Sequence, residues 1–247
     1  MSIEAGPHPA EQLWAEHAYQ GDYPPGVLPV PKTIIGTAFF PGGYGLFLAE
    51  PGPGLPRFPF GGVMVLGHDF HSEMNYRRSL ERGGEILSQP TWRNILKLLA
   101  QAEIPTGDCF FTNFFMGLRQ GTQTTGAFPG SKSVPYVEHC RRFLLRQLEV
   151  QRPRLVLTLG IHTPHLIARL SPELAPWGVK QGLKHLDASG PVQVEVSFVG
   201  LSGFRTTVAA LTHPSFRHAS VRHRRFDGVV GAEAELKMLI VAKSMVE

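Results

Sequence analysis

Two short segments carry residue types that could do chemistry together. The first is Gly67-His68-Asp69-Phe70-His71, which follows the apolar run Val63–Leu66; the second is His213-Pro214-Ser215, which follows the run Thr207–Leu211. Short continuous apolar runs are typical of strands covered on both faces. If both strands are parallel neighbours, Asp69 and His213 emerge at one sheet edge, where open α/β sheets form binding crevices. A carboxylate facing an imidazole there, in a basic protein, suggests chemistry on an anionic polymer.

The elements that must position these residues alternate along the chain. We expect four principal strands at 63–66, 109–112, 155–159 and 207–211, an extra strand at 192–199, and helices around 92–99, 137–148, 162–170 and 232–242. Strand–helix–strand repetition implies parallel strands with helices on both faces. The predicted fold is therefore three-layer α/β/α with a central four-stranded parallel sheet. Its strand ends carry His68, Asp69, Asn113, Gly160 and His213 to one edge.

The region before the first of these strands has a different composition. Residues 1–31 are rich in Pro, Gly and His, and we expect them to form an N-terminal arm lying on a single domain of residues 32–247. Residues 33–49 combine two apolar runs with Pro41-Gly42-Gly43 between them, which predicts an N-terminal hairpin.

Composition and charge exclude several protein classes. The 247 residues are 43% hydrophobic and 18% charged, as in a globular protein, and the net charge of +4 permits nucleic-acid binding. No apolar run is long enough to span a membrane, and residues 1–17 do not resemble a signal peptide. The two cysteines, Cys109 and Cys140, cannot form a cysteine-built zinc or iron–sulfur site. We expect a cytoplasmic monomer without a cofactor, a resident metal ion or a membrane partner.

The order of these motifs resembles that of the uracil-DNA glycosylase superfamily. The resemblance covers roughly Gly62 to Arg225, and it rests on motifs that follow successive strands: Gly67–His71, Thr112-Asn113, residues 147–160, and His213-Pro214-Ser215. It implies a DNA glycosylase, which hydrolyses the N-glycosidic bond of a flipped uracil or related base. Since the motifs contain no lysine to form a Schiff base, we expect a monofunctional enzyme with water as nucleophile.

The resemblance also implies a role for each matched residue. Asp69 would orient the attacking water and stabilise positive charge on the sugar. Asn113 would read the Watson–Crick edge of the base, and His213 would hydrogen-bond its carbonyl oxygen as the glycosidic bond breaks. The physics agrees, because cleavage leaves an anionic base and a cation-like sugar. Ser215 and the residues after it would form a loop that enters the minor groove.

Because the chain departs from the best-known members of the superfamily at three positions, the identity of the excised base stays open. Those members have Gln, Pro and Tyr where this chain has His68, Phe70 and His71, and the tyrosine closes the pocket against substituents on the base's 5-carbon. His71 is smaller, so an enlarged 5-modified pyrimidine, for example in modified viral DNA, is an alternative substrate. We expect His68, Phe70, His71 and Asn113 to bind the base. Phe70, Tyr76 and Trp92 all qualify as the aromatic residue stacked on it.

Two segments are expected to hold the DNA backbone. Residues 216–225 form the densest basic segment and offer an apolar wedge, while residues 130–133 suit phosphate contact through backbone N–H groups. The predicted DNA-binding residues are Ser131, Lys132, Ser133, Ser215, Phe216, Arg217, Arg222, Arg224 and Arg225.

Two other classes of function remain open at the level of the sequence. The chain could be a non-catalytic nucleic-acid-binding module that kept the scaffold. It could also be a metal-dependent hydrolase built from His68, Asp69, His71 and His213, although these residues match no established metal signature.

Overall fold

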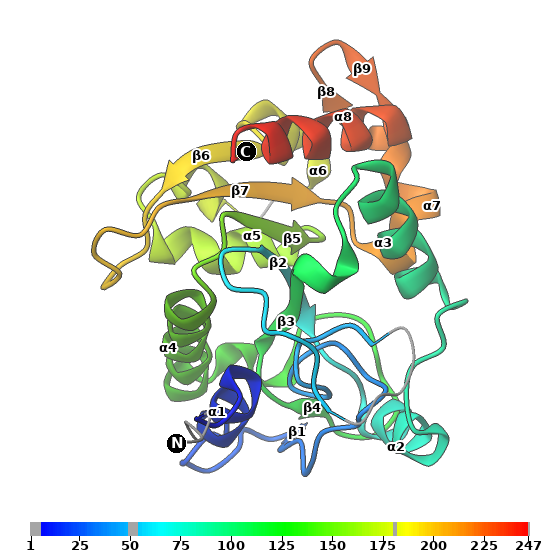
Figure 1. Cartoon of the computed structure of the whole chain (residues 1–247), viewed down its shortest axis with the longest axis vertical. Coiled ribbons are helices and arrows are strands. Elements are labelled where there is room, and N and C mark those ends of the chain that lie inside the picture. Colours follow the sequence, from blue (N-terminus) through cyan, green and yellow to red (C-terminus); the bar gives the residue numbers. More distant parts are fainter. Residues whose placement is uncertain (1–5, 49–53, 180–181, 247) are drawn as a thin grey trace, which may run out of the picture.

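A mostly parallel sheet forms the centre of the computed structural model, which describes residues 6–48, 54–179 and 182–246. The strands lie in the order β3-β2-β5-β7-β6 (Figure 1). Their bounds are β2 Val63–Asp69, β3 Cys109–Phe115, β5 Leu155–Leu159, β6 Val192–Val196 and β7 Thr206–Leu211. The four predicted principal strands are parallel, and β6 joins β7 in the antiparallel direction. The sheet therefore has five strands rather than four, because the predicted extra strand extends its edge.

Helices cover both faces of this sheet, as the three-layer prediction required. On one face Met64 and Leu66 pack with α4 (Val134–Gln151) and α5 (His162–Ile167). On the other face Val63 and Val65 pack with α3 (Pro90–Gln101) and α8 (Gly231–Ser244). Alternate residues of one strand thus enter separate cores, which explains why the strands read as continuous apolar runs. The helix expected over 162–170 ends at Ile167 and continues as a 3₁₀ turn, Ala168–Leu170.

Several short elements lacked an apolar pattern that could have predicted them. The helix α2 (Glu73–Arg82) carries five charged side chains among its ten residues, so no apolar stripe marks it. The other α-helices are α1 Pro9–Glu16, α6 Leu183–Ala188 and α7 Arg217–Ser220. Two small pairings join β1 (Val27–Leu28) to β4 (Leu118–Arg119) and β8 (Arg225–Phe226) to β9 (Val229–Val230). Further 3₁₀ turns lie at Thr106–Asp108, Pro129–Lys132, Ala175–Gly178, Pro214–Phe216 and Val221–His223.

The predicted N-terminal hairpin is wrong. Residues 33–48, here named the edge loop, form no paired strands, and Ala49 lies outside the described residues. The loop bonds to the edge of the main sheet instead: the Phe40 N–H donates to the Phe111 carbonyl at 3.0 Å, and the Phe111 N–H donates to the Gly45 carbonyl at 2.8 Å. Because β3 is an edge strand, its exposed backbone groups offered partners that competed with self-pairing.

The described part of the N-terminal arm packs closely on the rest of the protein. Ala10 and Leu13 of α1 are fully buried, and Arg146 of α4 donates to the Glu16 carboxylate at 2.8 Å. Further along, Val27 and Leu28 pair with β4, which leads directly into the cavity described below. Residues 6–31 therefore contribute to the same core and brace the region after β3.

Candidate active site

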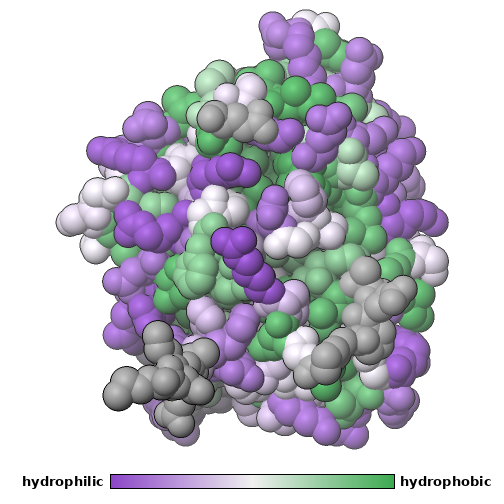
Figure 2. Space-filling view, in the orientation of Figure 1, coloured by the Kyte–Doolittle hydropathy of each residue, from purple (hydrophilic) through white to green (hydrophobic). Residues whose placement is uncertain are grey.

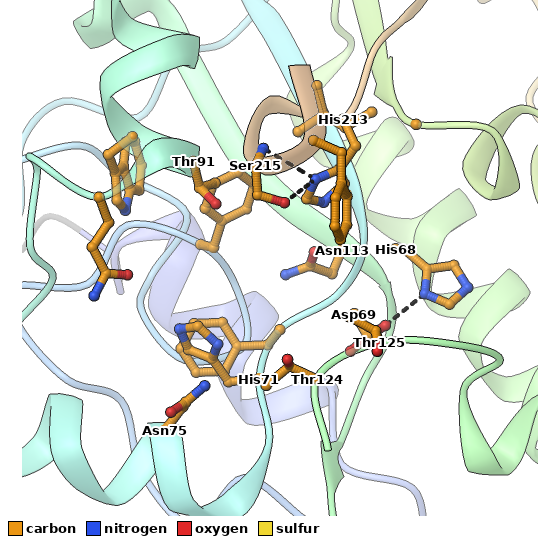
Figure 3. A pocket seen from close by; sticks show the side chains of 18 of the residues that line it. His68, Asp69, His71, Asn75, Thr91, Asn113, Thr124, Thr125, His213 and Ser215 are labelled. Atoms are coloured by element: carbon orange, nitrogen blue, oxygen red, sulfur yellow. Dashed lines mark hydrogen bonds and ion pairs between the residues drawn. The ribbon is translucent and has the colours of Figure 1, made fainter. Parts of the chain in front are cut away.

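A cavity of about 590 Å³ opens at the carboxyl edge of the parallel strands. The structure brings together all the strand-end residues that the sequence singled out, namely His68, Asp69, Asn113, Gly160 and His213. In Figure 3, His213 and Ser215 lie on one side of Asn113, and Asp69 and His68 lie on another. Parallel register produces this convergence, because Gly67 pairs with Asn113 and Leu159 pairs with Leu211, two residues before His213.

The Asp69 carboxylate is held by a buried arginine. Arg119 donates from Nε to Oδ1 at 2.8 Å and from Nη2 to Oδ2 at 2.9 Å, and the His68 Nδ1 lies 2.5 Å from Oδ2. Arg119 also donates to the carbonyls of residues 125, 126 and 127. A bidentate arginine fixes both the charge and the rotamer of its carboxylate. The carboxylate thus faces the cavity in a single orientation.

These partners decide the protonation state of Asp69. Burial raises the pKa of its carboxyl, but the hydrogen bonds from Arg119 and His68, with their charges, lower it more, to about 2. The side chain is therefore ionised at all physiological pH values. A carboxylate with so low a pKa is a weak proton acceptor but a permanent negative charge.

His213, unlike Asp69, is held in its uncharged state. Burial lowers the pKa of its imidazole to about 4, His68 and His162 act in the same direction, and Asp69 opposes them. The Ser215 N–H donates to Nδ1 at 3.3 Å, and the Ser215 Oγ lies 2.8 Å from the same nitrogen (Figure 3). Because Nδ1 accepts a hydrogen bond, the neutral ring carries its proton on Nε2. His213 is thus a neutral donor.

Asn113 is anchored by the edge loop. Its Nδ2 donates to the Phe40 carbonyl at 2.9 Å, which fixes the orientation of the amide and uses one of its two N–H groups. A Cβ at position 67 would lie 2.3 Å from the Asn113 Oδ1, so the neighbouring strand must carry glycine there. Gly160 has a φ of +82° and would bring a Cβ to 3.1 Å from that of His213. Gly67 and Gly160 therefore leave the space that the Asn113 amide and the His213 side chain occupy.

The family to which this architecture belongs follows from comparison with known proteins. A family model described as the uracil DNA glycosylase superfamily matches residues 63–237, which is more than half of the chain. The chain belongs to the uracil-DNA glycosylase superfamily. None of the curated proteins compared with it matches the chain. Members of the superfamily are typically hydrolytic DNA glycosylases acting on DNA.

Aromatic side chains form an apolar wall of the cavity. Phe70 and Trp92, two of the three predicted stacking candidates, line it, and so does Phe39 of the edge loop. The third candidate, Tyr76, is not among the lining residues, because its hydroxyl donates to the Lys32 carbonyl at 2.9 Å. His71 also lines the cavity, and burial lowers the pKa of its imidazole while Asp69 opposes this.

Part of the predicted DNA-binding surface is structural instead, and Arg224 is the clearest correction. Its side chain is fully buried; Nε donates to Asp187 at 2.9 Å and Nη2 donates to the Ala210 carbonyl at 2.7 Å. Glu235 of α8, also fully buried, accepts hydrogen bonds from the Thr212 N–H at 2.6 Å and from Arg217 at 2.8 Å. Both arginines therefore help to anchor the loop that carries His213, since buried charges require partners.

The remaining predicted DNA contacts lie on the surface. Arg222, Arg225, Lys132 and Ser131 are exposed, Ser133 is half-buried before α4, and Phe216 is 50% exposed at the rim of the cavity. Figure 2 shows hydrophilic side chains gathered over α7 and the β8–β9 hairpin at the upper right. Phe216, Arg222 and Arg225 are thus accessible from solvent, and their contact with DNA stays a prediction.

Sequence reasoning missed Arg119, Phe39, Asn75 and Glu85, all of which line the cavity. Arg119 left one signal: it is the only charged residue in the stretch Cys109–Gln120, and a cation in such apolar surroundings needs a buried anion. Within the described residues, no group of three or more His, Cys, Asp or Glu side chains is arranged to hold a metal ion. In the same part of the chain, no helix is long and apolar enough to cross a membrane.

Substitution of the buried Arg224 should lower the stability of the protein much more than substitution of the exposed Arg222. Arg224→Ala leaves the largely buried Asp187 carboxylate without its ion-pair partner, so we expect the free energy of unfolding to fall by about 3–5 kcal/mol. Arg222→Ala should change it by less than about 0.5 kcal/mol. Urea denaturation of both variants measures this difference. If Arg224→Ala kept full stability and only weakened DNA binding, the assignment of Arg224 to the core would be incorrect.

The low pKa of His213 predicts a pH-dependent loss of stability. The unfolded chain binds a proton below about pH 6.5, whereas the folded imidazole resists protonation until about pH 4. Stability contributed by the neutral ring is therefore lost as pH falls through this window. Between pH 7 and 4.5 we expect wild-type protein to lose about 2 kcal/mol more than His213→Gln. Denaturation curves at the two pH values give the comparison, and equal losses would contradict it.

Proposed function

We propose that this protein is a monofunctional DNA glycosylase that hydrolyses the N-glycosidic bond of a flipped pyrimidine, uracil or a related base, with water as the nucleophile. The observation that carries the proposal is the meeting of an ionised carboxylate and a neutral imidazole donor in one cavity, with the Asn113 amide between them. These groups match the charges that develop when a glycosidic bond breaks.

The proposed reaction begins with bond cleavage. As the bond from the base nitrogen to C1′ breaks, its electron pair moves to the base, and His213 Nε2–H donates to the base carbonyl oxygen that gains negative charge. The carboxylate of Asp69 stabilises the positive charge on the sugar. A water molecule then adds its oxygen to C1′, and the proton it loses passes through solvent to the departing base anion, which leaves a neutral free base and an abasic site with a hydroxyl group on C1′.

Two features support water rather than an amine as the nucleophile. None of the described residues that line the cavity is a lysine, so the cavity offers no ε-amine for a Schiff base. Arg119 holds the Asp69 carboxylate in place through two hydrogen bonds. A carboxylate held in this way suits the role of a fixed negative charge that orients water better than the role of a group that carries protons.

Exposed residues at the rim of the cavity and beyond it would contact the DNA. Phe216 would fill the gap left by the flipped nucleotide, and Arg222 and Arg225 would pair with phosphates. Ser131, Lys132 and Ser133 would contact the backbone on the other side, and a monomer would suffice for this footprint.

Release of free base from single-stranded and duplex oligonucleotides containing uracil tests the proposal. We expect wild-type protein to release uracil and leave an intact abasic site. His213→Gln and Asp69→Asn should each lower the single-turnover rate about 10²–10³-fold, since each removes charge stabilisation in the transition state. Asp22→Asn, an exposed substitution outside the cavity, is the matched control and should retain the wild-type rate.

Asp69→Asn also leaves Arg119 without its carboxylate, so a melting curve must accompany the rate; His213→Gln breaks no ion pair and provides the independent readout. DNA binding without release of any base, unaffected by Asp69→Asn, would identify a non-catalytic binding module and overturn the proposal.

A further inference from the structure

The loop that contains His213 is held at both ends by one side chain. One carboxylate oxygen of Glu235, on α8, accepts a hydrogen bond from the Thr212 N–H at 2.6 Å, and the other accepts one from the Arg217 Nε at 2.8 Å. Thr212 directly precedes His213, and Arg217 is the first residue of α7. We name these two contacts the Glu235 clamp, because a single carboxylate binds the two ends of residues 212–217.

The middle of the same loop is held from a different helix. In Figure 1 the loop follows β7 and lies beside α3. The Asn94 Nδ2 of α3 donates to the Pro214 carbonyl at 2.8 Å, and the Ser215 N–H donates to the His213 Nδ1 at 3.3 Å. A side chain keeps a productive position only when the groups that support it are themselves fixed by hydrogen bonds. The position of the His213 ring therefore depends on the residues that hold its loop.

Packing alone does not explain a carboxylate at position 235. Glu235 is fully buried, and its neighbours among the buried positions of α8 include Met238 and Leu239. Replacing a buried ion pair with apolar residues is often neutral or stabilising. Arg224, whose Nη1 lies 3.8 Å from the Glu235 Oε1, already pairs with Asp187. The carboxylate is therefore better explained by the loop that it holds than by the stability that it adds.

We propose that Glu235 is a positioning residue, whose carboxylate holds the loop so that the His213 Nε2–H points to the base carbonyl oxygen. The inference rests on the proposed glycosylase function and extends it to a residue outside the cavity, since Glu235 is not one of the described residues that line it. Glu235 acts only through Thr212 and Arg217. A donor stabilises a developing oxyanion only at the correct distance, and a displacement of about 1 Å can lower a rate on the order of 10²-fold.

Two substitutions remove the clamp in steps. Glu235→Gln keeps the volume and a carbonyl oxygen for the Thr212 N–H, but it removes the charge that pairs with Arg217. Glu235→Leu removes both contacts. We expect the single-turnover rate of uracil release at saturating protein to fall about 3–10-fold for the first variant and about 10–100-fold for the second. The dissociation constant of a uracil-free oligonucleotide should change by less than about threefold in both, since the altered side chain is buried away from the DNA.

A second measurement follows His213 without any catalysis. Burial lowers the pKa of its imidazole to about 4, and His68, Asp69 and His162 are the titratable groups that act on the ring. When the clamp is removed, water reaches the ring, so the pKa of His213 should rise towards its ordinary value in Glu235→Leu. Titration of the imidazole resonances by NMR measures this pKa, and His213→Gln identifies the resonance.

Controls separate positioning from a general loss of stability. Glu233→Gln makes the same chemical change at an exposed position of α8, so the rate and the pKa of His213 should keep their wild-type values. Leu148→Ala creates a cavity in the core on the opposite face of the sheet. It should lower the melting temperature while the folded protein still releases uracil at the wild-type rate. Melting curves establish that each variant is folded at the assay temperature.

The possible outcomes are distinguishable. A wild-type rate in folded Glu235→Leu, or a lower rate with an unchanged pKa of His213, would overturn the positioning role and leave the proposed function standing. If Glu235→Leu does not fold, Glu235→Gln provides the same two measurements. No uracil release by wild-type protein would overturn the proposed function and with it the role of Glu235 in that reaction. A raised pKa of His213 would then still show that Glu235 holds the loop.

Discussion

The ion pair between Asp69 and Arg119 is the interaction on which the site depends. A carboxylate in a largely buried wall is costly unless a cation and hydrogen bonds compensate it, and Arg119 provides both while also binding the carbonyls of residues 125–127. The guanidinium therefore ties the end of β2 to β4 and to the loop after it. The arm enters the same arrangement, since β1 pairs with β4. Segments distant in sequence are fixed around one charge.

Around this charge, burial gives three neighbouring groups different protonation states. Asp69 is ionised because Arg119 and His68 outweigh desolvation, whereas Glu85 is protonated near neutral pH because only backbone N–H groups offset its burial. His213 is neutral because desolvation outweighs the attraction of Asp69. Titratable groups with diverging pKa values in one cavity are typical of functional sites. The cavity thus combines a fixed anion with two neutral hydrogen-bonding groups, which suits a substrate whose charge develops only during the reaction.

The sequence predicted the parts of the site that depend on strand ends, and it failed where long-range packing decides. Periodicity located β2, β3, β5 and β7, and parallel order then implied that Asp69, Asn113 and His213 converge. The turn residues of the edge loop predict a hairpin because they do not reveal that β3 competes for its backbone groups. The arginine-rich segment predicts a DNA contact at Arg224 because it does not show which side chains point inward. Phe39 and Glu85 carry no local signal, since their place in the cavity arises from contacts between the edge loop and the segment after α2.

The groups of the cavity stand on two kinds of element. Asp69 and His213 follow strands of the main sheet, and its parallel register fixes how they lie relative to each other. The cavity side of α2 stands on a helix whose N-terminus is capped by Ser72 and whose buried Tyr76 packs in the same core as the sheet. Arg119, which lies outside α2, holds the Asp69 carboxylate. A change confined to the cavity side of α2 can therefore alter the lining of the cavity while the Asp69–Arg119 pair keeps its contacts.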